Sequence, residues 1–322
     1  MRSPSFHPLF EIDGAALAAE AAAGLLAPAA NTHPKFFYDA LGSHLFDAIT
    51  ELDEYDLRRT ESAVFARQGA AIAGALQAVL PARPTLIDLG AGNCAKGERL
   101  FALCDPGRYV AVDISVDFLR QSLDRLQRSH PQRELLGVGL DFSTELALPE
   151  ALTEPGSLVF YPGSSIGNFD PGAALRLLAQ ARALSRGGAL LIGVDLLKPV
   201  AELQAAYDDA LGVTAAFNLN LLRHLNRLLG ADFAPREWQH QALWNAAEQR
   251  VEMHLQARTD LCVRWPGAER RFAAGERIHT ENAYKWSVPA FSALLRDAGW
   301  TQVQAWTDAP ADAARFAVLL AR

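Results

Sequence analysis

Short apolar runs alternate with amphipathic stretches through the middle of the chain. The apolar runs have the length of β-strands, and apolar positions recur at helical spacing between them, so the pattern predicts strands and helices in turn. This alternation is typical of an α/β protein. The predicted strands span 85–89, 108–113, 134–140, 157–162 and 188–194, and the predicted helices span 60–80, 95–103, 115–129 and 171–184.

A long segment interrupts this order after the fifth predicted strand. Its first part predicts helices, its second part predicts short antiparallel strands separated by turns, and the α/β pattern then resumes. The predicted elements are helices at 200–211 and 218–229, strands at 240–245, 250–257 and 259–263 with turns at 246–249 and 266–276, a helix at 288–299, and strands at 300–306 and 316–320.

We therefore predict two domains. Residues 60–196 and 286–322 form an α/β domain with a Rossmann-like sheet. Residues 1–59 and the inserted 197–285 form a second, α+β domain that binds substrate and lids the ligand site. Small-molecule sites often lie at such domain boundaries.

A glycine-rich turn follows the first predicted strand. Asp88 precedes Gly90 and Gly92, and the next predicted strand ends on Asp113, which can accept hydrogen bonds from two ribose hydroxyls. Dinucleotide-binding turns usually have a third glycine, where this chain has Ala95. An acid before two glycines resembles the S-adenosylmethionine (SAM) loop of class I methyltransferases. The alternative is an ordinary strand-to-helix turn with a surface aspartate.

Composition and charge narrow the classes of function. The 322 residues are 50% hydrophobic, which is enough to form a core for two domains. The net charge is −7 and no block of basic residues occurs, so we expect no nucleic-acid partner. The first residues lack the pattern of a signal peptide, and no apolar run is long enough to cross a membrane.

Cysteine usage points to a reducing compartment. Cys94, Cys104 and Cys262 are too few and too scattered for a disulfide framework or a metal knuckle. Cys94 lies inside the glycine-rich turn, where we interpret it as a small filler. We therefore expect a cytoplasmic protein, a monomer, with no bound metal.

Longer motifs along nearly the whole chain resemble those of one enzyme family. They are PKFFYDALGS (34–43), LF (45–46), ITELDEY (49–55), RTE (59–61), GSSIGN (163–168), AYDD (206–209), GVT (212–214), FN (217–218) and IHTE (278–281). On these motifs the chain resembles the histidine Nα-methyltransferases of ergothioneine biosynthesis, which are SAM-dependent class I methyltransferases.

The resemblance implies a set of site residues. The family's SAM-binding positions fall on Tyr38, Gly90, Lys96, Asp113, Asp141 and Phe142. Its substrate positions fall on Tyr55, Gly163, Asn168, Tyr207, Met253, Glu281 and Ala283.

These side chains suit a free amino acid as substrate. Asn168 and Tyr207 can hold its carboxylate by hydrogen bonds, and Glu281 can accept a hydrogen bond from an imidazole N–H. Tyr38 is the candidate to orient the amine. Ala283 stands where relatives usually have a serine that could bond the imidazole, so we expect weaker selection of histidine.

Four of these positions also have plain structural interpretations. Asn168 would cap the helix that begins at Pro171, Tyr55 would be a core aromatic, Met253 would pack within a strand, and Lys96 would be solvated.

We predict an enzyme that uses SAM to methylate the α-amine of histidine, three times, to the betaine hercynine. One alternative is an enzyme of the same family that acts on another amino acid, such as tryptophan or a histidine derivative. A second alternative is a catalytically silent SAM-binding regulator. The joint presence of Tyr55, Asn168, Tyr207 and Glu281 favours an enzyme, since a silent protein need not keep them.

Overall fold

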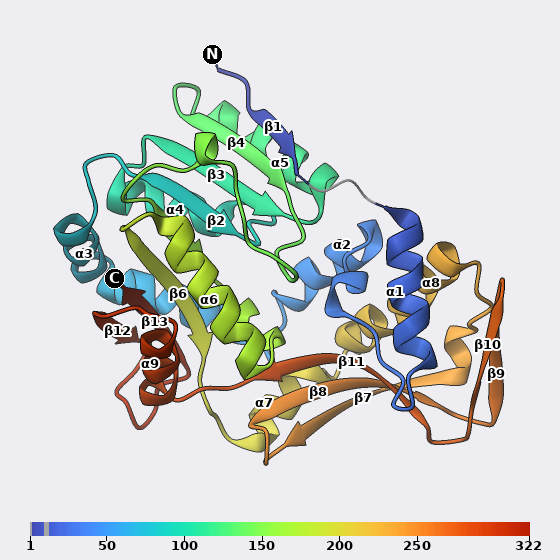
Figure 1. Ribbon diagram of the computed structural model, residues 1–322. Coiled ribbons are helices and arrows are strands. Elements are labelled where there is room, and N and C mark those ends of the chain that lie inside the picture. Colours follow the sequence, from blue (N-terminus) through green and yellow to red (C-terminus); the bar gives the residue numbers. More distant parts are fainter. Residues whose placement is uncertain (1, 10–12) are drawn as a thin grey trace. The chain divides into compact units, whose positions relative to one another are not determined.

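The computed structural model describes residues 2–9 and 13–322, which divide into two compact units (Figure 1). No helix within these described residues is long and apolar enough to cross a membrane. Unit 1 comprises residues 2–9, Leu57–Leu197 and Lys285–Arg322, and unit 2 comprises residues 13–56 and Lys198–Tyr284.

Unit 1 is built on an eight-stranded sheet with the order β1-β4-β3-β2-β5-β6-β13-β12. Neighbouring strands are parallel except that β13 runs antiparallel to both β6 and β12. Apart from the edge strand β1, this is the sheet of class I methyltransferases, so the predicted fold class is confirmed. The strands are β1 (Ser5–Pro8), β2 (Thr85–Leu89), β3 (Arg108–Asp113), β4 (Glu134–Gly139), β5 (Leu158–Tyr161), β6 (Ala189–Asp195), β12 (Val303–Thr307) and β13 (Phe316–Ala321).

Helices cover both faces of this sheet (Figure 1). Successive side chains of a strand point to opposite faces, so Leu86 joins one apolar core while Ile87 and Leu89 join the other. Because both faces are covered, the central strands are mostly apolar, and polar residues within them, such as Thr85 and Asp88 of β2, are buried. The helices are α3 (Leu57–Val79), α4 (Ala95–Cys104) and α5 (Val116–Ser129) at the first core, and α6 (Pro171–Ser185) and α9 (Val288–Asp297) at the second.

Unit 2 combines helices with two small antiparallel sheets. Strands β11, β8 and β7 form a three-stranded sheet in that order, and β9 and β10 form a hairpin. The carboxylate of Asp209 accepts hydrogen bonds from the N–H groups of Val213 and Thr214, at 2.9 and 2.7 Å, and so caps α8. The elements are α1 (Gly14–Leu26), α2 (Ala40–Ile49), α7 (Val200–Tyr207), α8 (Val213–Leu229), β7 (Trp238–Asn245), β8 (Arg250–Ala257), β9 (Leu261–Trp265), β10 (Ala268–Phe272) and β11 (Arg277–Tyr284).

Some elements differ from the sequence prediction. Ser5–Pro8 was assigned to the second domain with the rest of 1–59, but it forms β1 and pairs with β4 in the sheet of unit 1. The stretch 266–276, predicted as a turn, contains β10. Strand β11 was not predicted, because a register shift between His279 and Glu281 interrupts the alternation of polar and apolar residues along it.

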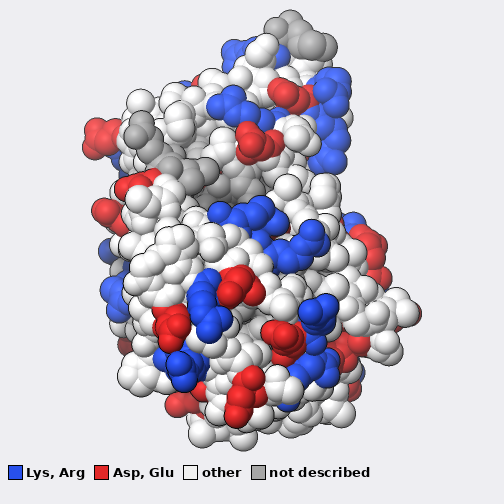
Figure 2. Space-filling view, turned by 90° about the vertical axis from the view of Figure 1, so that its right-hand side faces the viewer, with Lys and Arg blue, Asp and Glu red and all other residues white. Residues whose placement is uncertain are grey.

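The surface drawn in Figure 2 mixes both signs of charge. Lys and Arg side chains lie among Asp and Glu side chains on this face. A nucleic-acid surface gathers basic side chains on one face or along one helix. The described residues of this face do not have that distribution.

Candidate active site

The predicted glycine-rich turn connects β2 to α4 in unit 1. Gly90 and Gly92 have φ angles of +67° and +51°, which residues with a side chain rarely adopt. The N–H groups of Gly90 and Ala91 donate to the Val112 carbonyl at 2.9 and 3.1 Å, and this ties the turn to β3. Without a Cβ at the two glycines, a ligand can approach the backbone closely.

Asp113 ends β3 beside this turn. Its Oδ2 accepts a hydrogen bond from the N–H of Gly92, and its Oδ1 accepts one from the N–H of Ser115, both at 2.8 Å. Burial raises the pKa of Asp113, although these two N–H groups act against the shift. Each carboxylate oxygen has a second lone pair, so the oriented carboxylate can still accept ribose hydroxyls.

Asp141 and Phe142 follow β4, the strand next to β3. The Phe142 ring packs edge-on against Tyr161, with 5.8 Å between the centroids. A Cβ built on Gly90 would lie 3.9 Å from the same ring, so Phe142 adjoins the glycine-rich turn. Asp141 is 7% exposed and accepts a hydrogen bond from the N–H of Ser143 at 3.0 Å.

Lys96, Glu61 and Gly163 meet in unit 1. Nζ of Lys96 lies 2.6 Å from Oε2 of Glu61, whose Oε1 accepts a hydrogen bond from the N–H of Gly163 at 2.8 Å. A Cβ on Gly163 would lie 2.6 Å from Lys96 Nζ, so a larger residue would displace the ammonium. Lys96 therefore contacts a protein carboxylate that is 1% exposed. Glu61 is not among the site residues expected from the sequence, where its only signal is the RTE motif.

Asn168 ends a short 3₁₀ helix, Ser165–Asn168, after β5. Helix α6 is capped by Asp170, whose Oδ1 accepts a hydrogen bond from the N–H of Ala173 at 2.8 Å. The alternative that Asn168 caps α6 is therefore wrong. The amide of Asn168 is half-buried and follows the carboxyl end of β5, as Asp113 follows that of β3 and the glycine-rich turn follows that of β2. Parallel sheets bind ligands at this edge.

In unit 2, three candidates share one face of the β11-β8-β7 sheet. Met253 lies opposite Glu281, and Ala283 lies two residues further along β11 on the same face. Met253 and Glu281 are 2% and 8% exposed. In a regular strand His279 and Glu281 would point the same way, but the register shift between them puts them on opposite faces.

Tyr207 reaches this face from the end of α7. Its carbonyl accepts a hydrogen bond from His240 Nε2 at 2.8 Å, and Asn218 Nδ2 lies 2.8 Å from the other ring nitrogen. His240 pairs with Leu255, two residues from Met253, so all three share a face. Burial lowers the pKa of His240, which fits a neutral ring that donates to Tyr207 and accepts from Asn218.

Tyr38 and Tyr55 belong to an aromatic cluster in unit 2. Tyr55 packs edge-on against Tyr207 and Phe46, with 6.2 and 6.5 Å between the ring centroids, and Phe46 packs against Tyr38 at 5.7 Å. The cluster brings the three candidate tyrosines together. Tyr55 is also 9% exposed, so it contributes to the core as the plain interpretation expects.

Known proteins match this chain through both of its units. The profile of a family described as "Histidine-specific methyltransferase, SAM-dependent" matches residues 17–322. The chain belongs to this family. Histidine N-alpha-methyltransferases of Mycolicibacterium smegmatis and Mycobacterium tuberculosis are each 39% identical to it, over 92% and 87% of both chains respectively. Ergothioneine biosynthesis protein 1 of Neurospora crassa is 29% identical over 84% of this chain and 31% of its own length.

Asp88, the acid that precedes the glycine-rich turn of this methyltransferase, has a buried side chain. It is 1% exposed, and its Oδ2 accepts a hydrogen bond from the Tyr109 hydroxyl at 2.6 Å. Burial raises the pKa of Asp88 to about 7. A Cβ on Gly97 would lie 2.3 Å from Oδ2, so this acid packs under the first turn of α4 and is not the surface aspartate of the alternative interpretation. Cys94 is buried nearby, and burial raises its pKa to about 12, as suits the predicted filler.

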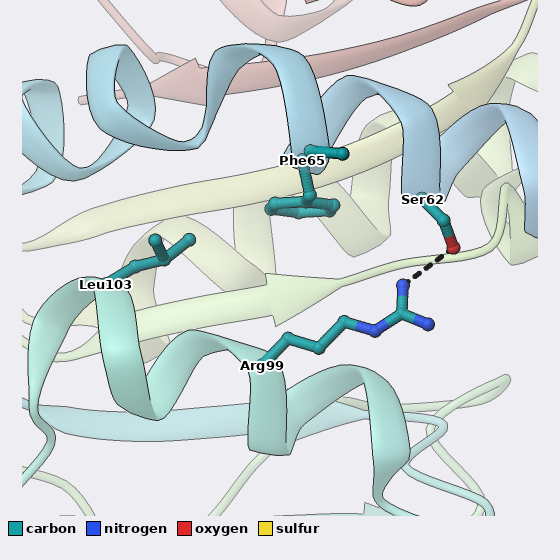
Figure 3. Close-up of a pocket in the computed structure, with 5 residues that line it drawn as sticks. Ser62, Phe65, Arg99 and Leu103 are labelled. Atoms are coloured by element: carbon teal, nitrogen blue, oxygen red, sulfur yellow. Dashed lines mark hydrogen bonds between the residues drawn. The ribbon is translucent and has the colours of Figure 1, made fainter.

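A hollow elsewhere on unit 1 of the methyltransferase lies between α3 and α4 (Figure 3). Its lining is Ser62, Phe65, Ala66, Arg99 and Leu103. Arg99 Nη1 donates a hydrogen bond to the Ser62 hydroxyl at 2.7 Å. None of these residues is a SAM or substrate candidate.

Proposed function

We propose that this methyltransferase transfers methyl groups from SAM to the α-amino nitrogen of L-histidine, three times, to give hercynine for ergothioneine biosynthesis. The observation that carries the proposal is the family profile over residues 17–322. SAM loops occur in many unrelated methyltransferases, whereas this match also runs through unit 2, which carries Met253 and Glu281. We further propose that the protein works in the cytoplasm, in keeping with its free cysteines, and that it is a monomer.

The side chains at the carboxyl edge of the unit 1 sheet fit SAM. Gly90 and Gly92 open the backbone to the ligand, and the oriented Asp113 carboxylate accepts from the ribose hydroxyls. Asp141 accepts from the adenine amino group, beside the apolar ring of Phe142. SAM supplies a methyl group on a sulfonium, already activated for displacement, so the protein mainly has to orient the attacking amine.

The side chains of unit 2 fit histidine. Glu281 is buried, and a buried carboxylate that accepts the imidazole N–H would be left without that partner by an apolar amino acid. The Tyr207 hydroxyl holds the substrate carboxylate. The expectation from the sequence that Asn168 also binds this carboxylate stays a prediction. The Tyr38 hydroxyl orients the amine.

The reaction requires no strong general base. The α-ammonium group loses its proton to water, and its neutral lone pair is then the nucleophile. What the protein contributes is alignment of this lone pair with the transferred methyl group. The aromatic cluster of Tyr38, Phe46, Tyr55 and Tyr207 supplies apolar walls that exclude water.

Mass spectrometry of the product tests the proposal. The untagged protein is incubated with SAM and either L-histidine or histamine, and we expect histidine to gain three methyl groups while histamine, which has no carboxylate, gains none. Tyr207→Phe should weaken histidine binding by about 1 kcal/mol and leave SAM binding unchanged. Equal turnover of histamine and histidine would rule out the carboxylate contacts.

A second candidate substrate is another amino acid, such as tryptophan. The observation that favours it is Ala283, which is 4% exposed on the face of Glu281 and offers no hydroxyl to an imidazole. Glu281→Ala should lower kcat/KM for histidine more than for tryptophan. If it lowers both equally, the histidine assignment loses its chemical basis. If SAM binds and no amino acid is methylated, the protein is the silent regulator.

A further inference from the structure

The opposite face of the β11-β8-β7 sheet carries a second group of polar side chains. Glu252 and His254 lie two residues apart on β8 and so share this face. His279 of β11 lies directly across from His254. One carboxylate oxygen of Glu252 and one ring nitrogen of each histidine all lie within 4.8 Å of one another. The proposed methyl transfer uses none of these side chains.

The carboxylate of Glu252 is held so that one oxygen faces the histidines. Its Oε1 accepts hydrogen bonds from Asn245 Nδ2 at 2.9 Å and from Arg250 Nε at 2.8 Å. Its Oε2 lies 3.0 Å from Nε2 of His254. Burial opposes ionisation of Glu252, but the hydrogen bonds from Asn245, Arg250 and His254 lower its pKa to about 2, so the group is a carboxylate.

Both histidines have a buried ring nitrogen without a hydrogen-bond partner among the described residues. These atoms are Nδ1 of His254, which is 8% exposed, and Nε2 of His279. A buried polar atom without a partner lowers stability, and such an atom in a native structure often indicates a ligand or water. Burial lowers the pKa of both rings, which favours the neutral form that ligates metals.

The backbone fixes the position of His279. Its N–H donates to the Ala30 carbonyl, and its own carbonyl accepts from the N–H of Thr32, both at 2.9 Å. With β8 on its other side, this residue of β11 has a partner on each edge. The register shift that follows it sends Glu281 to the substrate face. The cluster therefore adjoins the irregularity on which the orientation of Glu281 depends.

We propose that Glu252, His254 and His279 bind a divalent transition-metal ion, with Zn²⁺ preferred. Residues two apart on one strand and a residue across from them converge on one side of a sheet. Two imidazoles and a carboxylate, with water as the fourth ligand, form a set that Zn²⁺ accepts at bond lengths of about 2.0–2.2 Å. The ion would join β8 to β11 beside the register shift. The proposal replaces the expectation from sequence that no metal is bound.

Zinc titration of the untagged protein tests the site directly. The protein is stripped with a chelator, and Zn²⁺ is titrated by calorimetry against a competing chelator of known affinity. We expect one tight equivalent. Loss of an outer partner of a metal site costs about 10–100-fold in affinity, so His279→Gln and His254→Gln should lose at least about 100-fold. The exposed His44→Gln and the opposite-face Glu281→Gln are matched controls that should keep the affinity.

Thermal unfolding gives a second measurement. Zn²⁺ should raise the Tm of the unmodified protein, whereas Mg²⁺ should not, because Mg²⁺ prefers oxygen ligands. The Tm of His279→Gln should not respond to Zn²⁺. Should His254→Gln fail to fold, Glu252→Gln replaces it in the titration. Absence of a tight equivalent, or equal affinity in His279→Gln, would overturn the proposal and leave the cluster as a hydrogen-bonded network. Neither measurement depends on whether histidine is methylated.

Discussion

The two units position the side chains that are expected to bind SAM or substrate in different ways. In unit 1 these groups follow the carboxyl ends of neighbouring parallel strands, and nearby backbone N–H groups orient them, as Gly92 and Ser115 orient Asp113. In unit 2 they lie on one face of an antiparallel sheet and on adjoining helices, and Glu281 reaches that face through a register shift. The first arrangement depends on contiguous sequence, and the second depends on pairing between distant segments.

The largest effect we expect concerns the place where the insertion joins unit 1. Lys285 Nζ lies 2.7 Å from Asp195 Oδ2, and both side chains are 1% exposed. Lys285→Met leaves a buried carboxylate without this cation, so the free energy of unfolding should fall by about 3–5 kcal/mol. Urea unfolding measures it, and the double variant Lys285→Met/Asp195→Asn should recover much of the loss. A change below about 1 kcal/mol, the range of exposed pairs, would show that unit 1 does not depend on this pair.

The next effect concerns the backbone-oriented acid of unit 1. Asp113→Ala removes an acceptor for the ribose hydroxyls, and each charge-assisted hydrogen bond contributes about 1.5–3 kcal/mol, so the Kd of SAM should rise by at least about 10-fold. Calorimetry measures it, with the exposed Asp124→Ala on α5 as the control. Unchanged SAM binding in a folded Asp113→Ala protein would contradict the cofactor site.

This difference between the units also explains what the sequence could predict. Hydrophobic periodicity predicted the succession of strands and helices in unit 1, and the glycine spacing predicted the turn with Asp113 at the next strand end, because those signals are local. The order of the strands within the sheet was not predicted. The inward position of Asp88 was not predicted, since it depends on the Tyr109 hydroxyl of the neighbouring strand. The Lys96–Glu61 contact joins residues of two different helices, α4 and α3, and no local sequence pattern indicates it.

For unit 2 the sequence was less informative. The resemblance named Met253 and Glu281, but periodicity missed β11 and so could not place them on one face. The separation of His279 from Glu281 depends on a single extra residue in one strand. Such a shift reverses which face every later side chain occupies, and it leaves no clear trace in composition.

A third prediction concerns how the stability of the folded protein depends on pH through Asp88 in unit 1. The pKa of Asp88 rises from its usual 3.8 to about 7 in the folded protein, so between these values the folded state keeps a proton that the unfolded chain has lost. Stability should therefore fall as pH rises through this window, by up to about 1.4 kcal/mol per pH unit. Asp88→Asn should remove the dependence, so its free energy of unfolding relative to that of the unmodified protein should rise by about 3 kcal/mol between pH 5 and pH 8. Parallel unfolding curves of the two proteins across this range would contradict it.

Glu252 in unit 2 should make stability depend on pH in the opposite direction, because its pKa is lowered rather than raised. Its pKa is lowered from 4.5 to about 2, so it stabilises the folded state above pH 4.5 and loses that contribution as pH falls toward 2. In the metal-free protein, Glu252→Gln should flatten the acid limb of the stability curve and leave the slope of the curve between pH 5 and pH 8 unchanged. Asp88→Asn should do the reverse.

The smallest effect tests whether the substrate face of unit 2 selects by hydrogen bonding. Ala283→Ser adds a hydroxyl two residues from Glu281 on the same face, where it can bond an imidazole. A site selects best when the wrong ligand leaves one of its polar groups unpaired, so kcat/KM for histidine over tryptophan should rise by up to about 10-fold, or 1.4 kcal/mol. Ala242→Ser adds the same hydroxyl opposite Met253 and should change the ratio less. If both variants raise the ratio equally, the gain comes from polarity of the face rather than from a bond at 283. Position 283 would then make no specific contribution, and the weaker histidine selection expected from Ala283 would have no structural basis.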